Sequence, residues 1–398
     1  MTTDDLTEPR IRHDERLPWA GLLALFFAGF LSILNETLPA GLLPDIARAL
    51  DVTEAVAGQT VTVYALATAV SAIPLSVALR RWNRRTVLVT ALAAFVVANL
   101  VIAVTDDFAV VLAARTVAGV GAGLIWTNLA AYAARLVPPS KQGRAMSIAN
   151  AGTPVALSLG LPLGTLLGTT TSWHSTFAVT GLAGVATIVW VLIALPGLPG
   201  VVATRPPRGE RARRDVLRGT PGVFTILAVM SGFFLAHNVL YTYIAPVVDE
   251  AGIASQVEWV LLTFGVAAFA SILVTGVWID RRHRHLTVAG VLLLATAFLV
   301  LGFATVAPVL VYLAAALWGL GFGGGATWFL TAGFRAAGSD SIAAVMVTLV
   351  NLMIGVGALV GGALIGNFGV GSLSWVSLAV VVPAAVATVV ARRHAFPR

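Results

Sequence analysis

The sequence contains no cysteine and little charge for its length of 398 residues. Without cysteine there is neither a disulfide framework nor a metal site with thiolate ligands, and the redox compartment stays undetermined. Charged residues make up 11% of the chain and hydrophobic residues 58%, whereas about a quarter of a typical soluble domain is charged. This composition excludes an ordinary soluble protein and indicates an integral membrane protein.

Several functional classes are disfavoured by what else is missing. The net charge is +7, but the arginines lie in short clusters between apolar stretches, and no basic face is interleaved with aromatics, so we expect no nucleic-acid partner. The sequence has no phosphate loop, no HExxH, no nucleophile elbow and no soluble domain of useful size, so we expect no enzymatic activity and no metal. Residues 1–16 mix charges of both signs and lack the features of a signal peptide.

Apolar stretches long enough to cross a bilayer recur along the chain. The first lies within 17–45, and further stretches follow near 56–79, 86–105, 109–134, 145–168, 176–195, 222–246, 259–279, 286–306, 308–334, 342–367 and 372–391. Residues 196–221, rich in Pro, Gly and Arg, cannot lie in hydrocarbon. We therefore predict an all-α integral membrane protein with twelve transmembrane helices: a tail at 1–16, a six-helix bundle at 17–195, a linker at 196–221, a second six-helix bundle at 222–391 and a tail at 392–398.

Positive charge gathers on one side of the predicted spans. Arginines occupy the linker and the loops on that side, among them Arg80, Arg81, Arg84, Arg85, Arg281, Arg282, Arg284 and Arg335. The opposite loops carry acids such as Asp51, Asp107 and Asp249, with Arg48 as their only arginine. Because positively charged loops remain in the cytosol, we predict a multi-pass protein of the cytoplasmic membrane with both termini and the linker cytosolic.

The second half of the chain repeats the first at an offset close to 200 residues. Three glycines at 119, 121 and 123 recur at 319, 321 and 323, and arginines 81 and 84 recur at 281 and 284. Gly29 and Asn35 correspond to Gly232 and Asn238. A repeat of this kind predicts two pseudo-symmetric bundles that enclose a site between them near the middle of the membrane.

Two charges are predicted deep inside the spans. Glu36 lies nine residues before Asp45, and Arg115 lies eight residues after Asp107, so both sit about 12–14 Å below the same membrane boundary. A charge there costs roughly 2.5–3.5 kcal/mol on insertion scales. We interpret Glu36 as a proton or substrate site, although it could also lie near the headgroups or in a structural pair.

Polar and aromatic side chains inside the spans are candidates for a substrate cavity with few polar anchors. His237 and Tyr241 are four residues apart and therefore share one helix face. Each residue could instead contribute a helix-to-helix hydrogen bond of about 0.6 kcal/mol. The predicted cavity set is Asn35, Tyr64, Asn128, His237, Asn238, Tyr241 and Asn351.

The loops after the second and the eighth helix carry related residues. The second-half loop contains Gly276, Asp280, Arg281 and Arg284. In the first half, Ser76, Arg80 and Asn83 replace the glycine, the aspartate and a second glycine. The pattern resembles the helix 2–3 signature of the major facilitator superfamily, in its twelve-helix drug:proton antiporter branch. The resemblance implies a cytosolic latch between the halves, altered in its first copy, made by Arg81, Arg84, Arg85, Gly276, Asp280, Arg281 and Arg284.

Two further motifs support the resemblance. Arg115, Gly119 and Gly121 match the family's helix 4 signature, which implies that Arg115 acts with Glu36 in proton coupling. The helix 5 antiporter motif is similar to Gly160, Pro162 and Gly164. Glycines spaced by four also allow two helices to pack closely, so tight packing remains an alternative for this motif.

The resemblance implies an exporter of a small organic solute or drug that works by proton antiport and alternating access, similar to bacterial efflux transporters of sugars, purine nucleosides or chloramphenicol. The proton would be the coupling ion, with no other cofactor. The expected partners are the small-molecule substrate and the lipid bilayer, and we expect a monomer. An uptake symporter or facilitator on the same fold is the main alternative, and a membrane receptor or enzyme a remote one.

The predicted orientation can be tested with single introduced cysteines, because the chain has none of its own. An impermeant thiol reagent added to intact cells should label Asp107→Cys and should not label Arg211→Cys until the membrane is permeabilised. The reverse labelling pattern would overturn the orientation.

Overall fold

The computed structural model describes residues 17–138, 141–200, 222–304, 307–337, 341–391 and 395–396. The predicted tail at 1–16, most of the linker and most of the tail at 392–398 lie outside the described residues. Within the described ranges, all regular structure is helical, and twelve helical stretches are long and apolar enough to cross a membrane. The predicted fold class is confirmed.

The helices of the N-terminal half are bounded as follows: α1 (Trp19–Ala49), α2 (Glu54–Ala57), α3 (Gln59–Ala78), α4 (Arg84–Ile102), α5 (Phe108–Arg135), α6 (Gln142–Asn150), α7 (Gly152–Val155), the π-helix η2 (Ala156–Gly160), α8 (Leu161–Thr170) and α9 (Trp173–Ala194). The fifth span is thus interrupted by a π-helical segment. Pro162, which has no N–H to donate, lies just beyond that segment.

The helices of the C-terminal half are bounded as follows: α11 (Val223–Tyr241), α12 (Ile244–Glu250), the 3₁₀ turn η3 (Ala254–Gln256), α13 (Val257–Leu301), α14 (Val309–Phe322), α15 (Gly325–Ala337), α16 (Ser341–Phe368) and α17 (Ser372–Val390). The eighth and ninth spans join within α13 at a kink, where Arg282 has non-helical φ −133° and ψ 30°. The seventh span breaks at Tyr243, between α11 and α12.

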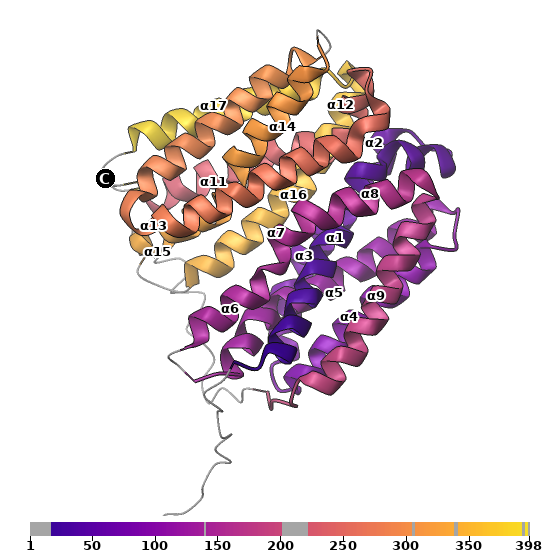
Figure 1. Cartoon of the computed structure of the whole chain (residues 1–398), viewed down its shortest axis with the longest axis vertical. Coiled ribbons are helices and arrows are strands. Elements are labelled where there is room, and N and C mark those ends of the chain that lie inside the picture. Colours follow the sequence, from indigo (N-terminus) through magenta and orange to yellow (C-terminus); the bar gives the residue numbers. More distant parts are fainter. Residues whose placement is uncertain are drawn as a thin grey trace, which may run out of the picture.

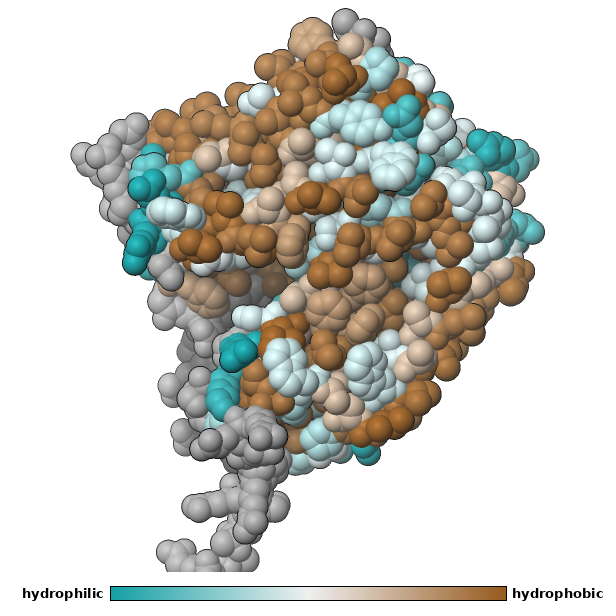
Figure 2. All heavy atoms as spheres, in the orientation of Figure 1, coloured by the Kyte–Doolittle hydropathy of each residue, from teal (hydrophilic) through white to brown (hydrophobic). Residues whose placement is uncertain are grey.

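Two helix bundles lie side by side, one from each half of the chain (Figure 1). Hydrophobic side chains cover most of the visible face, and hydrophilic residues gather toward its two ends (Figure 2). Large apolar side chains such as Ile193 (81% exposed) and Val277 (74% exposed) are accessible on the helices, as expected for surfaces that contact lipid rather than water.

The glycines of the fifth span allow α8 to pack against α1. A Cβ atom at Gly164 would lie 2.8 Å from Leu38 Cδ1, and one at Gly168 would lie 2.5 Å from Leu42 Cδ2. A Cβ at Gly265 of α13 would lie 2.4 Å from Ser158 Cα in η2. This segment therefore packs within its own half and also against the other half, which accounts for its small residues.

The two halves make close contacts at the end that carries Asp51, Asp107 and Asp249, here called the acidic end. There a Cβ at Gly362 of α16 would lie 3.0 Å from the carbonyl oxygen of Ala55. The halves spread apart toward α6 and α15, at the opposite, arginine end, which carries Arg81 and Arg281 (Figure 1).

Tyr243 fills the contact at the acidic end. Its side chain is fully buried, and its hydroxyl donates a hydrogen bond to the Ala358 carbonyl at 2.8 Å. A Cβ at Gly58, in the other half, would lie 2.0 Å from the Tyr243 hydroxyl oxygen, and one at Gly361 would lie 2.6 Å from its ring. The ring therefore needs glycines on both sides of the contact between the halves.

Replacing Gly58 by alanine should hold the acidic end open, because the added methyl group and the Tyr243 ring cannot occupy the same space. Spin labels on Asp51→Cys and Asp249→Cys should report longer distances in Gly58→Ala than in the parent protein. Gly366→Ala is the matched control, since nothing lies within 4 Å of its added Cβ. Equal distance distributions in both variants would show that the contact does not depend on Gly58.

Candidate functional site

Arg115 is fully buried inside the N-terminal half. Its guanidinium donates hydrogen bonds to three backbone carbonyls: Nη1 to Asn35 at 2.6 Å, Nε to Thr60 at 3.0 Å and Nη2 to Glu36 at 3.4 Å. It also lies over the Tyr64 ring, 4.4 Å from the centroid. Carbonyl dipoles and a π face therefore replace the water that a charge loses on burial.

Close packing of α5 on α3 brings these groups together. A Cβ at Gly119, one turn after Arg115, would lie 2.3 Å from the Tyr64 carbonyl oxygen. The Thr68 hydroxyl donates to the Gly119 carbonyl at 2.9 Å, and the Tyr64 hydroxyl donates to the Ser32 carbonyl of α1 at 3.0 Å. Gly119 therefore allows α1, α3 and α5 to come together around one guanidinium.

Glu36 is 6% exposed. No nitrogen of Arg115 lies within 4.0 Å of its carboxylate, since the ion pairs of the described chain are Arg48–Asp45 and His174–Asp106. The predicted neighbours thus meet through the Glu36 carbonyl and not through a salt bridge. Ile33 and Thr37 lie on a more accessible face of α1. Glu36 is about 60° around the helix from Ile33, so it lies beside that face rather than on it.

His237 and Tyr241 lie in the interior of the C-terminal half. His237 Nδ1 accepts a hydrogen bond from Trp318 Nε1 at 2.9 Å, and its ring stacks on Phe322 with centroids 3.6 Å apart. Nδ1 is an acceptor, so the ring proton of the neutral form is on Nε2. His237 lies about 200° around α11 from the half-buried Leu235, so it points away from that accessible face.

Most of the predicted cavity residues are covered. Asn35, Tyr64, Asn128, His237, Asn238 and Tyr241 are all at most 7% exposed, and Asn351 is the partly accessible member of the set. Both amide atoms of Asn35 and the Tyr241 hydroxyl are buried without a hydrogen-bond partner. The Asn238 and Asn351 amides each donate to a carbonyl of their own helix. The set therefore does not form one continuous open wall.

Asn128 belongs to an arginine cluster in the N-terminal half. Its amide donates to the Arg84 carbonyl at 2.9 Å, and Arg84 Nη1 donates back to its Oδ1 at 3.4 Å. Arg85 donates to the Leu195 carbonyl, at the end of α9, at 3.2 Å. These contacts assign Asn128 and Arg85 a structural role within their own half in this conformation.

Arg284 has the equivalent role in the second half. Its guanidinium donates to the carbonyl of Val389 at 2.8 Å, in the last turn of α17, and to the carbonyl of Phe396 at 2.7 Å, beyond the end of that helix. Arg81 and Arg281 are exposed, and a Cβ at Gly276 would meet nothing within 4 Å. The side chain of Asp280 lies outside the described residues. The latch between the halves remains a prediction.

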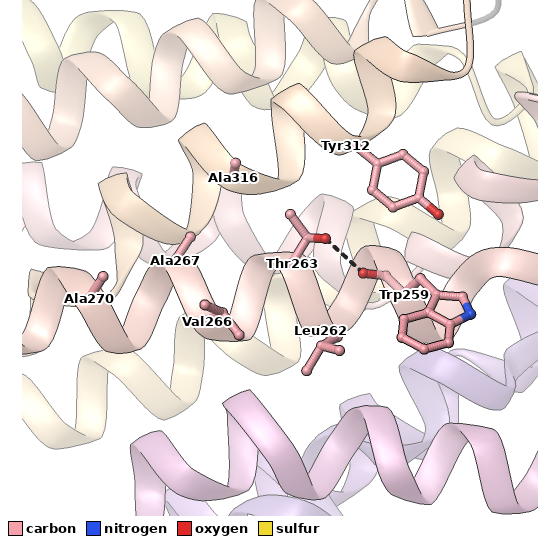
Figure 3. A pocket seen from close by; sticks show the side chains of 8 residues that line it. All are labelled: Trp259, Leu262, Thr263, Val266, Ala267, Ala270, Tyr312 and Ala316. Atoms are coloured by element: carbon pink, nitrogen blue, oxygen red, sulfur yellow. Dashed lines mark hydrogen bonds between the residues drawn. The ribbon is translucent and has the colours of Figure 1, made fainter.

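A groove of about 640 Å³ lies in the C-terminal half (Figure 3). Its lining comes from α13 and α14: Trp259, Leu262, Thr263, Val266, Ala267, Ala270, Tyr312 and Ala316. The Thr263 hydroxyl donates to the Trp259 carbonyl, and the Tyr312 hydroxyl donates to Gln256. With its hydroxyls engaged and its wall apolar, the groove is suited to lipid chains rather than to a polar solute.

Sequence reasoning missed the backbone groups that hold Arg115. Asn35, Thr60 and Glu36 hold it through their carbonyls, and a carbonyl is not visible as a residue type. Pro39 was the available signal, because a proline four residues after Asn35 removes the usual donor to the Asn35 carbonyl. In the described part of the chain, no three His, Asp or Glu side chains lie together as a metal site.

Comparison with known proteins gives one family and relatives whose names differ in function. The transcription regulatory protein OpdE of Pseudomonas aeruginosa is 29% identical over 402 residues, covering all of both chains. A sequence profile described as Major Facilitator Superfamily matches residues 25–347. The chloramphenicol efflux pump Rv0191 of Mycobacterium tuberculosis is 33% identical over 365 residues, covering 87% of each chain. The purine ribonucleoside efflux pump NepI of Escherichia coli K12 is 29% identical over 366 residues, covering 89% of each.

A solved structure shares the fold. It is the xylose transporter XylE from E. coli in a partially occluded inward open conformation, with a TM-score of 0.73 and 16% identity. The alignment covers 93% of this chain and 98% of that one. At this identity the likeness concerns the fold alone.

Removing Arg284 should destabilise the C-terminal half, because carbonyls at the end of α17 lose a charged donor. Arg284→Ala should lower the free energy of unfolding by about 1–3 kcal/mol, measured as a lower midpoint of thermal unfolding in detergent. The exposed Arg281→Ala is the control and should change it by less than about 0.5 kcal/mol. The same unfolding midpoint for Arg284→Ala and Arg281→Ala would contradict a structural role for Arg284.

Proposed function

Because this chain belongs to the major facilitator superfamily of membrane transporters, we propose that it exports a small organic solute across the cytoplasmic membrane in exchange for protons. Two efflux pumps at about 30% identity support export. The observation that carries the proton part is Glu36, a carboxyl group covered inside the N-terminal half beside a buried arginine.

Glu36 is the proposed proton carrier. A charged carboxylate in its position has little contact with water and no ion-pair nitrogen within 4.0 Å in the described chain, and such a charge is costly in a membrane interior. Proton binding removes that charge, and conformational change that exposes Glu36 to water would allow the proton to leave. The nearby positive charge of Arg115 favours release. Proton occupancy would then follow conformation, as antiport requires.

The arrangement of the halves supports alternating access. They are in contact at the acidic end and spread apart toward the arginine end (Figure 1). With the orientation predicted from the arginines, this is a conformation that faces the cytosol, from which a substrate for export would be loaded. The contact that Tyr243 makes with the N-terminal half, at the break between α11 and α12, would open when the chain changes to the outward-facing conformation.

One titrating carboxyl group is enough for useful export. A proton moving inward down about one pH unit supplies roughly 1.4 kcal/mol, and a potential of about 100 mV adds roughly 2.3 kcal/mol. The sum sustains a gradient of a few hundred-fold for a neutral solute. Chloramphenicol and purine ribonucleosides, named for two relatives, are the first solutes to test.

A second candidate function is uptake, by a symporter or a facilitator on the same fold. It is the second candidate because the fold, which is shared with a xylose transporter, does not by itself set the direction of transport. Inside-out vesicles under an imposed pH gradient separate the two, because only an antiporter accumulates solute in vesicles with an acidic lumen. Solute movement that merely follows its own gradient would favour a facilitator.

Replacing Glu36 by glutamine should separate binding from coupling. Inside-out vesicles with Glu36→Gln should still exchange labelled solute, but they should lose accumulation driven by an acidic lumen, because the glutamine side chain neither takes up nor releases a proton. Glu250→Gln, at an exposed glutamate of α12, is the matched control and should accumulate solute as the parent does. Proton-driven accumulation by Glu36→Gln at the parent level would exclude Glu36 as the coupling site.

A further inference from the structure

The shortest of the three Arg115 bonds goes to a carbonyl that its own helix leaves unpaired. In an α-helix, the carbonyl of residue i accepts from the N–H of residue i+4. Position 39 in α1 is a proline and has no N–H, so the Asn35 carbonyl lacks its intrahelical donor. Arg115 Nη1 takes that place at 2.6 Å, the shortest bond that the guanidinium makes.

The second proline of the same helix provides an internal comparison. Pro44 removes the donor to the Ala40 carbonyl in the same way. None of the three Arg115 bonds goes to Ala40. A proline in α1 is therefore not enough, and what distinguishes Pro39 is that the carbonyl it frees faces the guanidinium.

Anchoring by carbonyls determines how Arg115 behaves when Glu36 changes charge. Backbone carbonyls of α1 and α3 do not titrate, and the Tyr64 ring lies against the guanidinium. The arginine therefore stays in place whether or not Glu36 carries a proton. An arginine held mainly by the Glu36 carboxylate would lose its partner at each protonation and remain buried and unpaired, which is strongly unfavourable.

We propose that Pro39 is a positioning residue for the proton site: the carbonyl that it frees holds Arg115 beside Glu36 as a fixed positive charge that is not drawn into an ion pair. This inference rests on the proposed function of Glu36. Pro39 itself touches neither proton nor solute, and it acts through Arg115.

The charged groups around Glu36 are few. Arg115 on α5 and Tyr64 on α3 are the titratable side chains that interact with it electrostatically in the described chain. The other helices packed against α1 carry titratable residues nearer the ends of the spans, namely Glu54 on α2, Arg144 on α6, His174 on α9, Asp249 and Glu250 on α12, and, on α13, Glu258 near its start and Asp280, Arg281, Arg282, His283, Arg284 and His285 at its kink. A changed titration of Glu36 can therefore be traced to Arg115.

The test is Pro39→Ala, which returns an N–H to the Asn35 carbonyl. Arg115 then loses its best acceptor and turns toward the Glu36 carboxylate, which stays charged to a lower pH. Infrared difference spectra of the purified protein should show the protonated carboxyl band of Glu36, identified by its loss in Glu36→Gln. The midpoint of this band should move by about one pH unit to the acid side. A shift of that size corresponds to about 1.4 kcal/mol of added interaction between Arg115 and the charged form of Glu36.

Two comparisons separate positioning from a general change in the helix. Pro44→Ala makes the same chemical change in α1 and should leave the midpoint where the parent has it. In an Arg115→Gln background, Pro39→Ala should no longer shift the midpoint, because effects that act through one residue are not additive. A shift that persists without Arg115 would assign Pro39 a role in helix shape instead.

The outcomes distinguish the inference from the function on which it rests. A parent protein with no titrating Glu36 band between pH 5 and pH 9 would overturn the proposed proton site. A parent band with equal midpoints for Pro39→Ala and Pro44→Ala would overturn only the role of Pro39. Thermal unfolding of each variant, and its binding of labelled chloramphenicol or purine ribonucleoside, identify any variant that fails to fold.

Discussion

The burial of one guanidinium is the constraint on which the N-terminal half depends. Arg115 is always charged in practice, so a span can contain it only where the protein replaces its water. The replacement comes from carbonyls on α1 and α3 and from the Tyr64 ring. These acceptors are within reach because Gly119 lets α5 touch α3. One charge thereby fixes how three helices meet, and it keeps a positive charge near Glu36.

The second half joins the equivalent helices without a charge. Ala315 occupies the position that corresponds to Arg115 at the 200-residue offset, and Trp318 of α14 instead donates to His237 of α11. The aromatic rings around His237 pack closely and keep it buried. The repeat therefore preserves which helices pair, while the intramembrane charge belongs to the first half alone in the described residues.

Glycines allow the two halves to come into close contact. At the acidic end, Gly58, Gly361 and Gly362 surround the Tyr243 ring, so a large side chain closes the contact without strain. The hydrogen bond of Tyr243 to the Ala358 carbonyl stays within the C-terminal half, so the contacts of Tyr243 with Gly58 that must break when the halves part are van der Waals contacts. Lipid provides little hydrophobic force between helices, and a contact of this kind can reform in each transport cycle.

The sequence alone determined the membrane class, the twelve spans, the repeat and the two buried charges, because hydropathy and charge are read along one dimension. Only the tertiary structure decided that Arg115 binds carbonyls rather than the Glu36 carboxylate, that His237 faces the interior, and that Asn128 pairs with Arg84. Each residue turns a helix by about 100°, so the surroundings of a side chain depend on which helix packs against that face. That choice is made by contacts between residues far apart in the chain.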